Sequence, residues 1–187
     1  ARDGRDALWS WYNHHQSYTD AVYKLFNETP GRVGPPLEKP GLDIVEYFHT
    51  WLDRDGYPAW PFFSNILSWW EIRALPNVLL VHFNDLKADL KDSMRRIADF
   101  LQINVPEEEW QELTRHCSFE YMKENSDILM PELAASMKGG AKSLIYKGTN
   151  GRWRDTLTKS DIGKYELVAS RNLPPECARW LANGTSI

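Results

Sequence analysis

The sequence predicts one folded domain over residues 1–187, mostly helical, with a single segment of strand length. Residues 77–83 form a continuous apolar run after Pro76, which is typical of a buried parallel strand. About seven other segments have helical periodicity. A parallel strand needs neighbours at its edges and cover on both faces, so one strand is too few for an α/β layer. The residues alone therefore indicate either an unusual all-α protein or a piece of an α/β protein.

Composition excludes several classes of function. The net charge of −4, from 22 basic and 26 acidic residues, argues against a general nucleic-acid or membrane-surface binder. It leaves room for a local basic site. The two cysteines, Cys117 and Cys177, are too few for a disulfide framework and favour a reducing compartment such as the cytoplasm. His116-Cys117 lacks further ligands at zinc spacing, and no metal cofactor is expected.

Helical periodicity begins almost at the first residue. Asp3 is placed to cap a helix over residues 5–26, whose apolar residues recur at helical spacing. Four prolines and three glycines in residues 29–41 predict a loop or a mobile lid. Further helices are expected over residues 42–52, 62–74, 85–101, 107–115, 119–124, 160–170 and 175–182, with an irregular stretch over 126–150.

The first ten residues carry the first signal of a binding site. A phosphate is held well by an arginine fork, a hydroxyl and the free amides of a helix N-terminus. Arg2 lies just before the first predicted helix and Ser10 lies about two turns into it, so both can reach one anion. The alternative is a solvated arginine and a serine on the helix surface, and the residues alone favour that alternative.

Residues 2–12 resemble the 3′-phosphate-binding segment of sulfotransferases that use 3′-phosphoadenosine-5′-phosphosulfate (PAPS). In that family the pattern reads R-[ND]-[PAG]-[KR]-D, three residues, then S, and residues 2–10 carry every element. Residues 117–123 resemble the family's T-S-F-x-x-M-K, and residues 146–154 resemble its R-K-G-x-x-G-x-W-[KR] loop. Residues 65–71 resemble the helix before the family's last central strand, and residues 78–87 resemble that strand and its exit. The motifs stand in the family's order, so the chain looks like the C-terminal part of an aryl- or alcohol-sulfotransferase.

The resemblance implies an α/β sulfotransferase fold, related to P-loop NTPases, with a central parallel sheet flanked by helices. In the family, the phosphosulfate loop and the catalytic histidine precede the segment matched by residues 2–10. We therefore expect a missing N-terminal sulfotransferase segment upstream of Ala1, carrying the first strands and the catalytic base. The isolated chain is expected to be inactive.

The resemblance also implies a set of nucleotide-binding residues. Arg2 and Ser10 would bind the 3′-phosphate, together with Lys147 and Gly148, and Phe119 would stack on adenine. A flat ring suits a purine face, and glycine lets the backbone approach an anion closely. The alternatives are a core phenylalanine and a simple turn with an exposed lysine. The full expected set is Arg2, Ser10, Phe83, Cys117, Phe119, Lys147 and Gly148.

Three of the family's positions carry different residues here. Tyr146 stands where the family has an arginine, so one phosphate partner is lost. Phe83 replaces a tyrosine and has no hydroxyl for adenine, and Cys117 replaces a threonine and is a weaker hydrogen-bonder. We therefore expect either lower nucleotide affinity or compensation by other residues.

The implied activity is transfer of a sulfonate group from PAPS to a hydroxyl or amine of a small acceptor, with adenosine 3′,5′-bisphosphate (PAP) as the product. Positioning and charge stabilisation would carry most of the catalysis. His14 and His15 point in different directions on a helix, which favours a helix surface or pocket edge over a catalytic pair. The expected acceptor site is aromatic and lies under the 29–41 loop. Its residues are Trp11, Tyr12, Trp60, Phe62 and Phe63.

Besides the acceptor and the missing N-terminal segment, we expect no nucleic-acid partner and no membrane partner. Two alternative functions stay open. One is a non-catalytic nucleotide-binding module that keeps the fold without the chemistry. The other is a helical protein-interaction module in which tryptophans anchor the interface.

Overall fold

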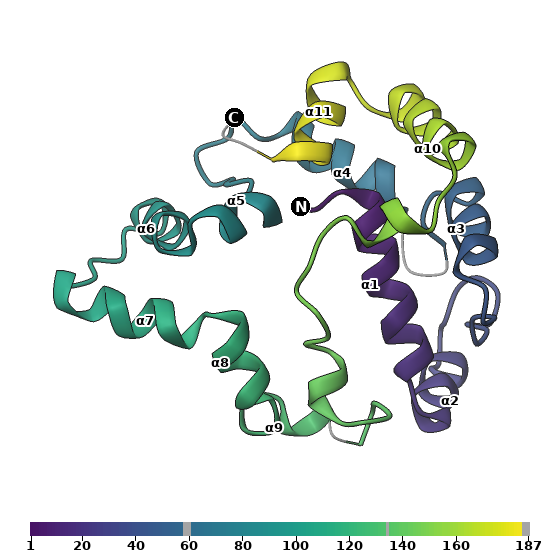
Figure 1. The fold of residues 1–187 in the computed structure, drawn as a ribbon, viewed down its shortest axis with the longest axis horizontal. Helices are drawn as coiled ribbons and strands as arrows, with labels where there is room; N and C mark the ends of the chain where they lie inside the picture. Colours follow the sequence, from purple (N-terminus) through teal and green to yellow (C-terminus); the bar gives the residue numbers. More distant parts are fainter. Residues whose placement is uncertain (58–60, 134, 185–187) are drawn as a thin grey trace.

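The computed structural model describes residues 1–57, 61–133 and 135–184, and these residues are mostly helical (Figure 1). The α-helices are α1 (Gly4–Ser17), α2 (Asp20–Glu28), α3 (Ile44–Asp53), α4 (Phe62–Glu71), α5 (Phe83–Ala88), α6 (Leu90–Phe100), α7 (Trp110–His116), α8 (Phe119–Glu124), α9 (Ser126–Leu129), α10 (Lys159–Asn172) and α11 (Pro175–Asn183). Short 3₁₀ segments are η1 (Glu107–Glu109), η2 (Pro131–Leu133), η3 (Ala141–Ser143) and η4 (Arg152–Asp155). The chain between α2 and α3 is irregular, which confirms the predicted loop.

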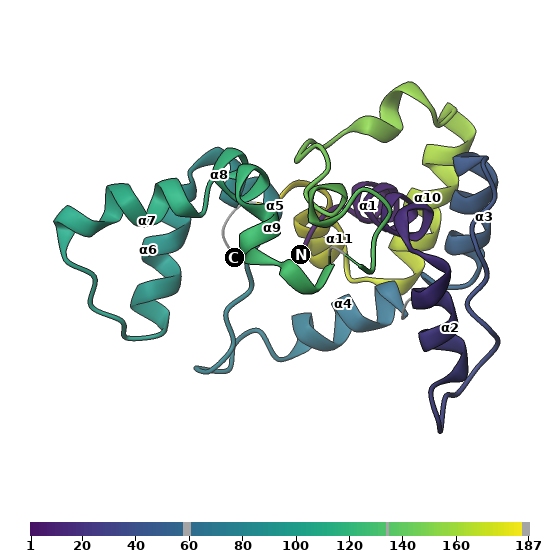
Figure 2. The ribbon, with the colours of Figure 1, turned by 90° about the horizontal axis from the view of Figure 1, so that it is seen from below.

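The elements divide between two ends of the molecule (Figure 2). Helices α6 and α7 lie at one end, and α2, α3 and α10 lie at the other. The chain from residue 137 to η4 runs back through the middle, beside α1, before it enters α10 (Figure 1). This return segment carries residues 146–154, which resemble the family's R-K-G-x-x-G-x-W-[KR] loop.

The predicted strand over residues 77–83 is wrong for this structure, because no described residue belongs to a β-strand. His82, near the end of this segment, has an extended backbone, and Ala1 pairs with it in the manner of a parallel strand. The Ala1 amino group donates to the Val81 carbonyl, and the Phe83 N–H donates to the Ala1 carbonyl at 2.8 Å. The pairing stops there because the chain turns into α1 at Gly4. The central parallel sheet expected from the resemblance is therefore absent from the described residues.

The predicted helix over residues 5–26 is broken into α1 and α2. The reason is a backbone contact with the return segment. The Thr19 N–H donates to the Ser136 carbonyl at 3.1 Å, and the Lys138 N–H donates to the Ser17 carbonyl at 2.6 Å. An isolated antiparallel bridge between Tyr18 and Met137 lies between these bonds. Backbone groups used in this way cannot continue the helix ladder.

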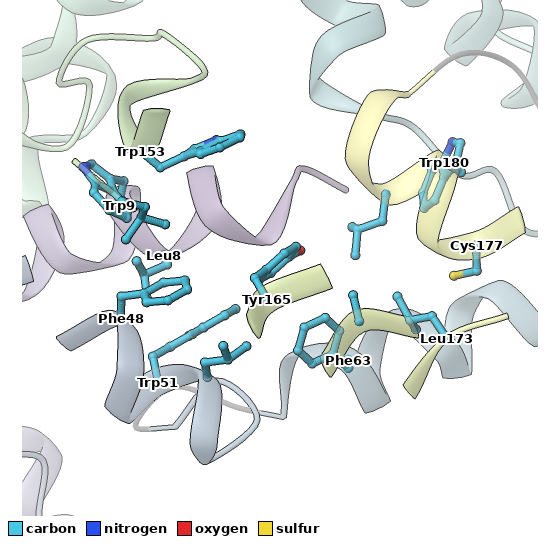
Figure 3. Packing of buried hydrophobic residues seen from close by; sticks show 14 of the residues in the cluster. Leu8, Trp9, Phe48, Trp51, Phe63, Trp153, Tyr165, Leu173, Cys177 and Trp180 are labelled. Atoms are coloured by element: carbon cyan, nitrogen blue, oxygen red, sulfur yellow. The ribbon is translucent and has the colours of Figure 1, made fainter. Parts of the chain in front are cut away.

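Aromatic side chains fill much of the core, which is built by α1, α3, α4, α10 and α11 (Figure 3). Leu8 and Phe48 are fully buried where α1 meets α3. Cys177, one of the two free cysteines, is also fully buried in this core. The most buried large members are Leu8, Phe48, Trp51, Leu52, Phe63, Tyr165, Leu173 and Leu181.

The start of α1 is locked in place from two sides. Gly4 donates its N–H to the Tyr165 hydroxyl at 3.1 Å, and a Cβ at this position would lie 2.5 Å from that oxygen. Arg5 forms two hydrogen bonds with the Asp3 carboxylate and stacks its guanidinium 3.9 Å from the Trp153 ring centroid. Asp6 accepts a hydrogen bond from the Gly151 N–H at 2.7 Å. These contacts fix the 146–155 loop against the first turn of α1.

Candidate functional site

One pocket gathers side chains from four distant segments of the chain. Six of the seven residues expected at the nucleotide line it, namely Arg2, Ser10, Phe83, Phe119, Lys147 and Gly148. They come from α1 and the residues just before it, the start of α5, the start of α8 and the return segment. Cys117 is not among the lining residues; it is an exposed free thiol at the C-terminus of α7. Whether these residues bind a nucleotide stays a prediction.

Arg2 is held firmly in the pocket wall. Its Nε donates to the Asn150 side-chain oxygen at 3.0 Å, and its Nη2 donates to the Thr149 carbonyl at 2.9 Å. Its guanidinium also lies 4.6 Å from the Phe83 ring centroid. A guanidinium has five N–H donors, so donors remain for an anion. Burial lowers the pKa of Arg2, but an arginine stays charged at any ordinary pH.

Gly148 and Phe119 touch in a way that requires glycine. Gly148 has φ +60°, and a Cβ there would lie 2.6 Å from the Phe119 ring. Lys87 donates to the Gly148 carbonyl, and Lys123 donates to the Tyr146 carbonyl. The loop is thus held by α5 and by α8, the helix that carries Phe119.

A second, more apolar pocket adjoins the first, and the two share Arg2, Ser10 and His14. Two residues expected at the acceptor, Trp11 and Phe62, line this second pocket. The other lining residues are Ala7, Trp51 and Gly56.

The remaining residues expected at the acceptor are placed elsewhere. Phe63 is buried in the core and does not line the pocket. Tyr12 donates its hydroxyl to the Gly41 and Leu42 carbonyls, at 3.0 and 2.8 Å, and so ties the 29–41 loop to α1. Trp60 lies outside the described residues.

Several lining residues of the first pocket stand outside the expected nucleotide-binding set, including Asn13, His14 and Arg152. For His14 the sequence indicated a helix surface or a pocket edge, and it lies in the pocket wall. A signal for two of them was available. Asn13 and His14 follow Ser10 by three and four residues, and residues at that spacing share a helix face. Burial lowers the pKa of His14 below its usual value. Arg152 occupies a variable position of the loop motif, and the pattern does not single it out.

A family model for the sulfotransferase domain matches residues 1–174. The chain belongs to this sulfotransferase family. The match confirms the resemblance inferred from the motifs at residues 2–154.

Curated sulfotransferases align with nearly the whole chain. Sulfotransferase 1B1 of Mus musculus is 29% identical over 174 residues, which cover 92% of this chain and 52% of that protein. Sulfotransferase 1 family member D1 of Mus musculus is 30% identical over 167 residues, which cover 89% and 50%. Human sulfotransferase 1C2 is 26% identical over 175 residues, which cover 92% and 53%. The chain thus spans about half the length of these relatives.

Solved sulfotransferase structures share the fold. Mouse sulfotransferase SULT7A1, complexed with PAP, has a TM-score of 0.73 at 20% identity, with 97% of this chain and 59% of that chain covered. Retinol dehydratase, in a complex with retinol and PAP, has a TM-score of 0.70 at 28% identity, with 94% and 46% covered. Over the residues described here, no helix is long and apolar enough to cross a membrane.

Proposed function

We propose that the protein containing this chain transfers a sulfonate group from PAPS to a hydroxyl or amine of a small acceptor. This chain would supply the 3′-phosphate and adenine parts of the donor site. The observation that carries the proposal is the convergence of Arg2, Ser10, Phe119 and Lys147 on one pocket in a member of the sulfotransferase family. The residues come from distant parts of the sequence, so their convergence is not a consequence of the local motifs.

The roles of the side chains follow from their chemistry. Arg2 and Lys147 offer positive charge to a phosphate, and the Ser10 hydroxyl adds a donor. Phe119 presents a flat ring for adenine, and its contact with Gly148 holds that ring beside the 146–155 loop, which would bind the 3′-phosphate.

In the proposed reaction the acceptor oxygen or nitrogen forms a bond to sulfur while the bond from sulfur to the 5′-phosphate oxygen breaks. PAP leaves with the electron pair of that bond. The acceptor's proton would pass to the histidine that the family carries ahead of the segment matched by residues 2–10. Activity is therefore proposed for the whole protein.

We place the acceptor in the second pocket, against Trp11, Trp51 and Phe62. The shared edge of the two pockets, at Arg2, Ser10 and His14, is where donor and acceptor would meet. Aromatic walls favour a small apolar alcohol, phenol or amine. Solved retinol dehydratase complexes hold retinol and androsterone, which are molecules of this kind.

The donor site is tested by calorimetric titration of the protein with PAP and with adenosine 5′-monophosphate (AMP). We expect selective binding of PAP, weakened at least about 10-fold in Arg2→Ala because a charge-assisted hydrogen bond is lost. Arg154→Ala is the matched control, since Arg154 is exposed and absent from the pocket lining. PAP binding without turnover would favour the non-catalytic module. A folded protein that binds no adenine nucleotide would favour the helical interaction module.

The acceptor site is tested by kinetics of the active protein. Phe62→Ala should raise the acceptor KM far more than the PAPS KM, because the ring lines the second pocket and does not line the first. Trp69→Ala, on the exposed side of the same helix, should change neither constant. Equal effects of Phe62→Ala on both KM values would contradict this placement.

A further inference from the structure

Arg152 is a partly buried cation in the wall of the first pocket. Its Nε is buried and has no hydrogen-bond partner among the described residues. A buried guanidinium N–H without an acceptor is costly, and such groups are rare in folded proteins unless a ligand or water satisfies them. Arg154, only two residues further on, is exposed.

The pocket concentrates positive charge. Arg2, Lys147 and Arg152 all line it. Burial is the main cause that lowers the pKa of Arg2, and the charge of Arg152 lowers it further, so the two guanidinium groups are within electrostatic reach of each other. Asp6 is the acid that acts on both, and it already accepts the Gly151 N–H. Like charges gathered at a partly buried site are unfavourable until an anion joins them.

Position 146 lacks the positive charge that the family's motif has there. The family's loop motif has an arginine there, and this chain has Tyr146. The Tyr146 ring centroid lies 5.5 Å from the Arg152 guanidinium and 5.2 Å from the Lys147 Nζ. Arg152 therefore places a positive charge beside Tyr146, whose own side chain is uncharged.

We propose that Arg152 is a binding residue for the 3′-phosphate of the donor nucleotide and replaces the arginine that position 146 lacks. The inference rests on the proposed function and adds a residue to its donor site. A terminal phosphate carries close to two negative charges, which suits two arginines and a lysine better than a single cation.

The test is titration of the protein with PAP and with AMP, which lacks the 3′-phosphate. Arg152→Gln should weaken PAP binding by about 10- to 150-fold, the range expected for loss of a hydrogen bond to a charged group. AMP binding should be nearly unchanged. Arg154→Gln is the matched control in the same 3₁₀ segment and should bind PAP as the wild type does.

A second variant separates charge from structure. Tyr146→Arg, added to Arg152→Gln, should recover most of the lost PAP affinity, because it restores an arginine at the position where the family has one. Wild-type PAP affinity in Arg152→Gln, or equal losses for PAP and AMP, would overturn the role of Arg152. Failure of the proposed function would look different: the wild-type protein itself would not prefer PAP to AMP.

Discussion

Gly148 shows at the scale of one residue why the 146–155 loop needs glycine. Replacement by alanine would place a methyl group 2.6 Å from the Phe119 ring and force a side chain into φ +60°. We expect Gly148→Ala to weaken PAP binding by at least about 10-fold, because the ring must move away from the loop. The backbone strain should also lower the free energy of unfolding by about 1–2 kcal/mol. Calorimetry and urea unfolding measure the two effects.

A matched control exists for this prediction. Gly34 also has a positive φ, +92°, and a Cβ there would meet nothing within 4 Å. Gly34→Ala should therefore show strain without loss of PAP affinity. Unchanged PAP binding in Gly148→Ala would show that the Phe119 ring does not contact the nucleotide.

His15 predicts a pH dependence of stability. It is buried against the rings of Trp11 and Tyr23, and its Nε2 has no partner among the described residues. Burial is the main cause that lowers its pKa to about 4, from 6.5 in the unfolded chain. Between these values the unfolded state binds a proton that the folded state does not. Stability should therefore fall by about 2 kcal/mol from pH 7 to pH 5.

The variant His15→Phe should flatten this dependence, since it keeps a ring and removes the titrating group. Urea unfolding of both proteins at pH 7 and pH 5 provides the measurement. His14 and His82 also have pKa values lowered by burial, so some slope should remain in the variant. An identical slope in the two proteins would assign the whole effect to those histidines.

Individual residues of the candidate site could be predicted where a motif fixes both the residue type and the helix end or helix face on which it lies. Arg2, Ser10 and Phe119 are of this kind, and all three reach one pocket. Arg152 could not be predicted, because its direction depends on the turn before it. Gly151 has φ +82° and starts the 3₁₀ segment that turns Arg152 into the pocket while Arg154 stays exposed.

At the scale of elements, α10 contains a glycine with no structural use. Gly163 lies exposed inside the helix, and a Cβ there would meet nothing within 4 Å. Glycine in a helix interior costs roughly 0.5–1 kcal/mol relative to alanine. Gly163→Ala should raise the free energy of unfolding by that amount, measured by urea unfolding.

Gly4 at the start of α1 provides the contrasting case. A Cβ there would lie 2.5 Å from the Tyr165 hydroxyl and 2.6 Å from Phe62. Gly4→Ala should therefore destabilise the protein by about 1–3 kcal/mol through overpacking. The same substitution in two helices is expected to act with opposite sign, and a loss of stability in Gly163→Ala would contradict the account of α10.

Periodicity predicted where several helices lie, but not where they break. The helix expected over residues 85–101 is two helices, α5 and α6, because Asp89 is extended and its carboxylate accepts the Asp92 N–H at the start of α6. The segment 119–124 was predicted with the bounds that α8 has. The break between α1 and α2 was not predicted, because helical spacing continues through residues 18 and 19. In the structure the Thr19 N–H donates to the distant Ser136 carbonyl, and the Ser17 carbonyl accepts the Lys138 N–H. The 77–83 segment has the composition of a strand, but pairing over one residue does not make one.

At the scale of the whole molecule, the candidate site depends on contacts that no local pattern contains. Lys87 and Lys123 connect the 146–155 loop to α5 and α8, and Asp6 connects it to α1. The return segment thus joins helices that come from both halves of the sequence (Figure 1). Family resemblance could predict which residues meet, because relatives share the fold. Periodicity and composition could not, because these contacts separate residues by more than 20 positions.

These connections predict where a bound nucleotide should stabilise the protein. At 100 times its dissociation constant, PAP should add about 2.7 kcal/mol to the free energy of unfolding. Amide hydrogen exchange should slow most in α8 and in residues 144–152, because the ligand would bridge Phe119, Lys147 and Arg152. Helix α2 supplies no lining residue of the first pocket and should change little. Protection spread evenly over α2 and α8 would show that PAP acts on global stability alone, and protection confined to other segments would move the nucleotide site away from this pocket.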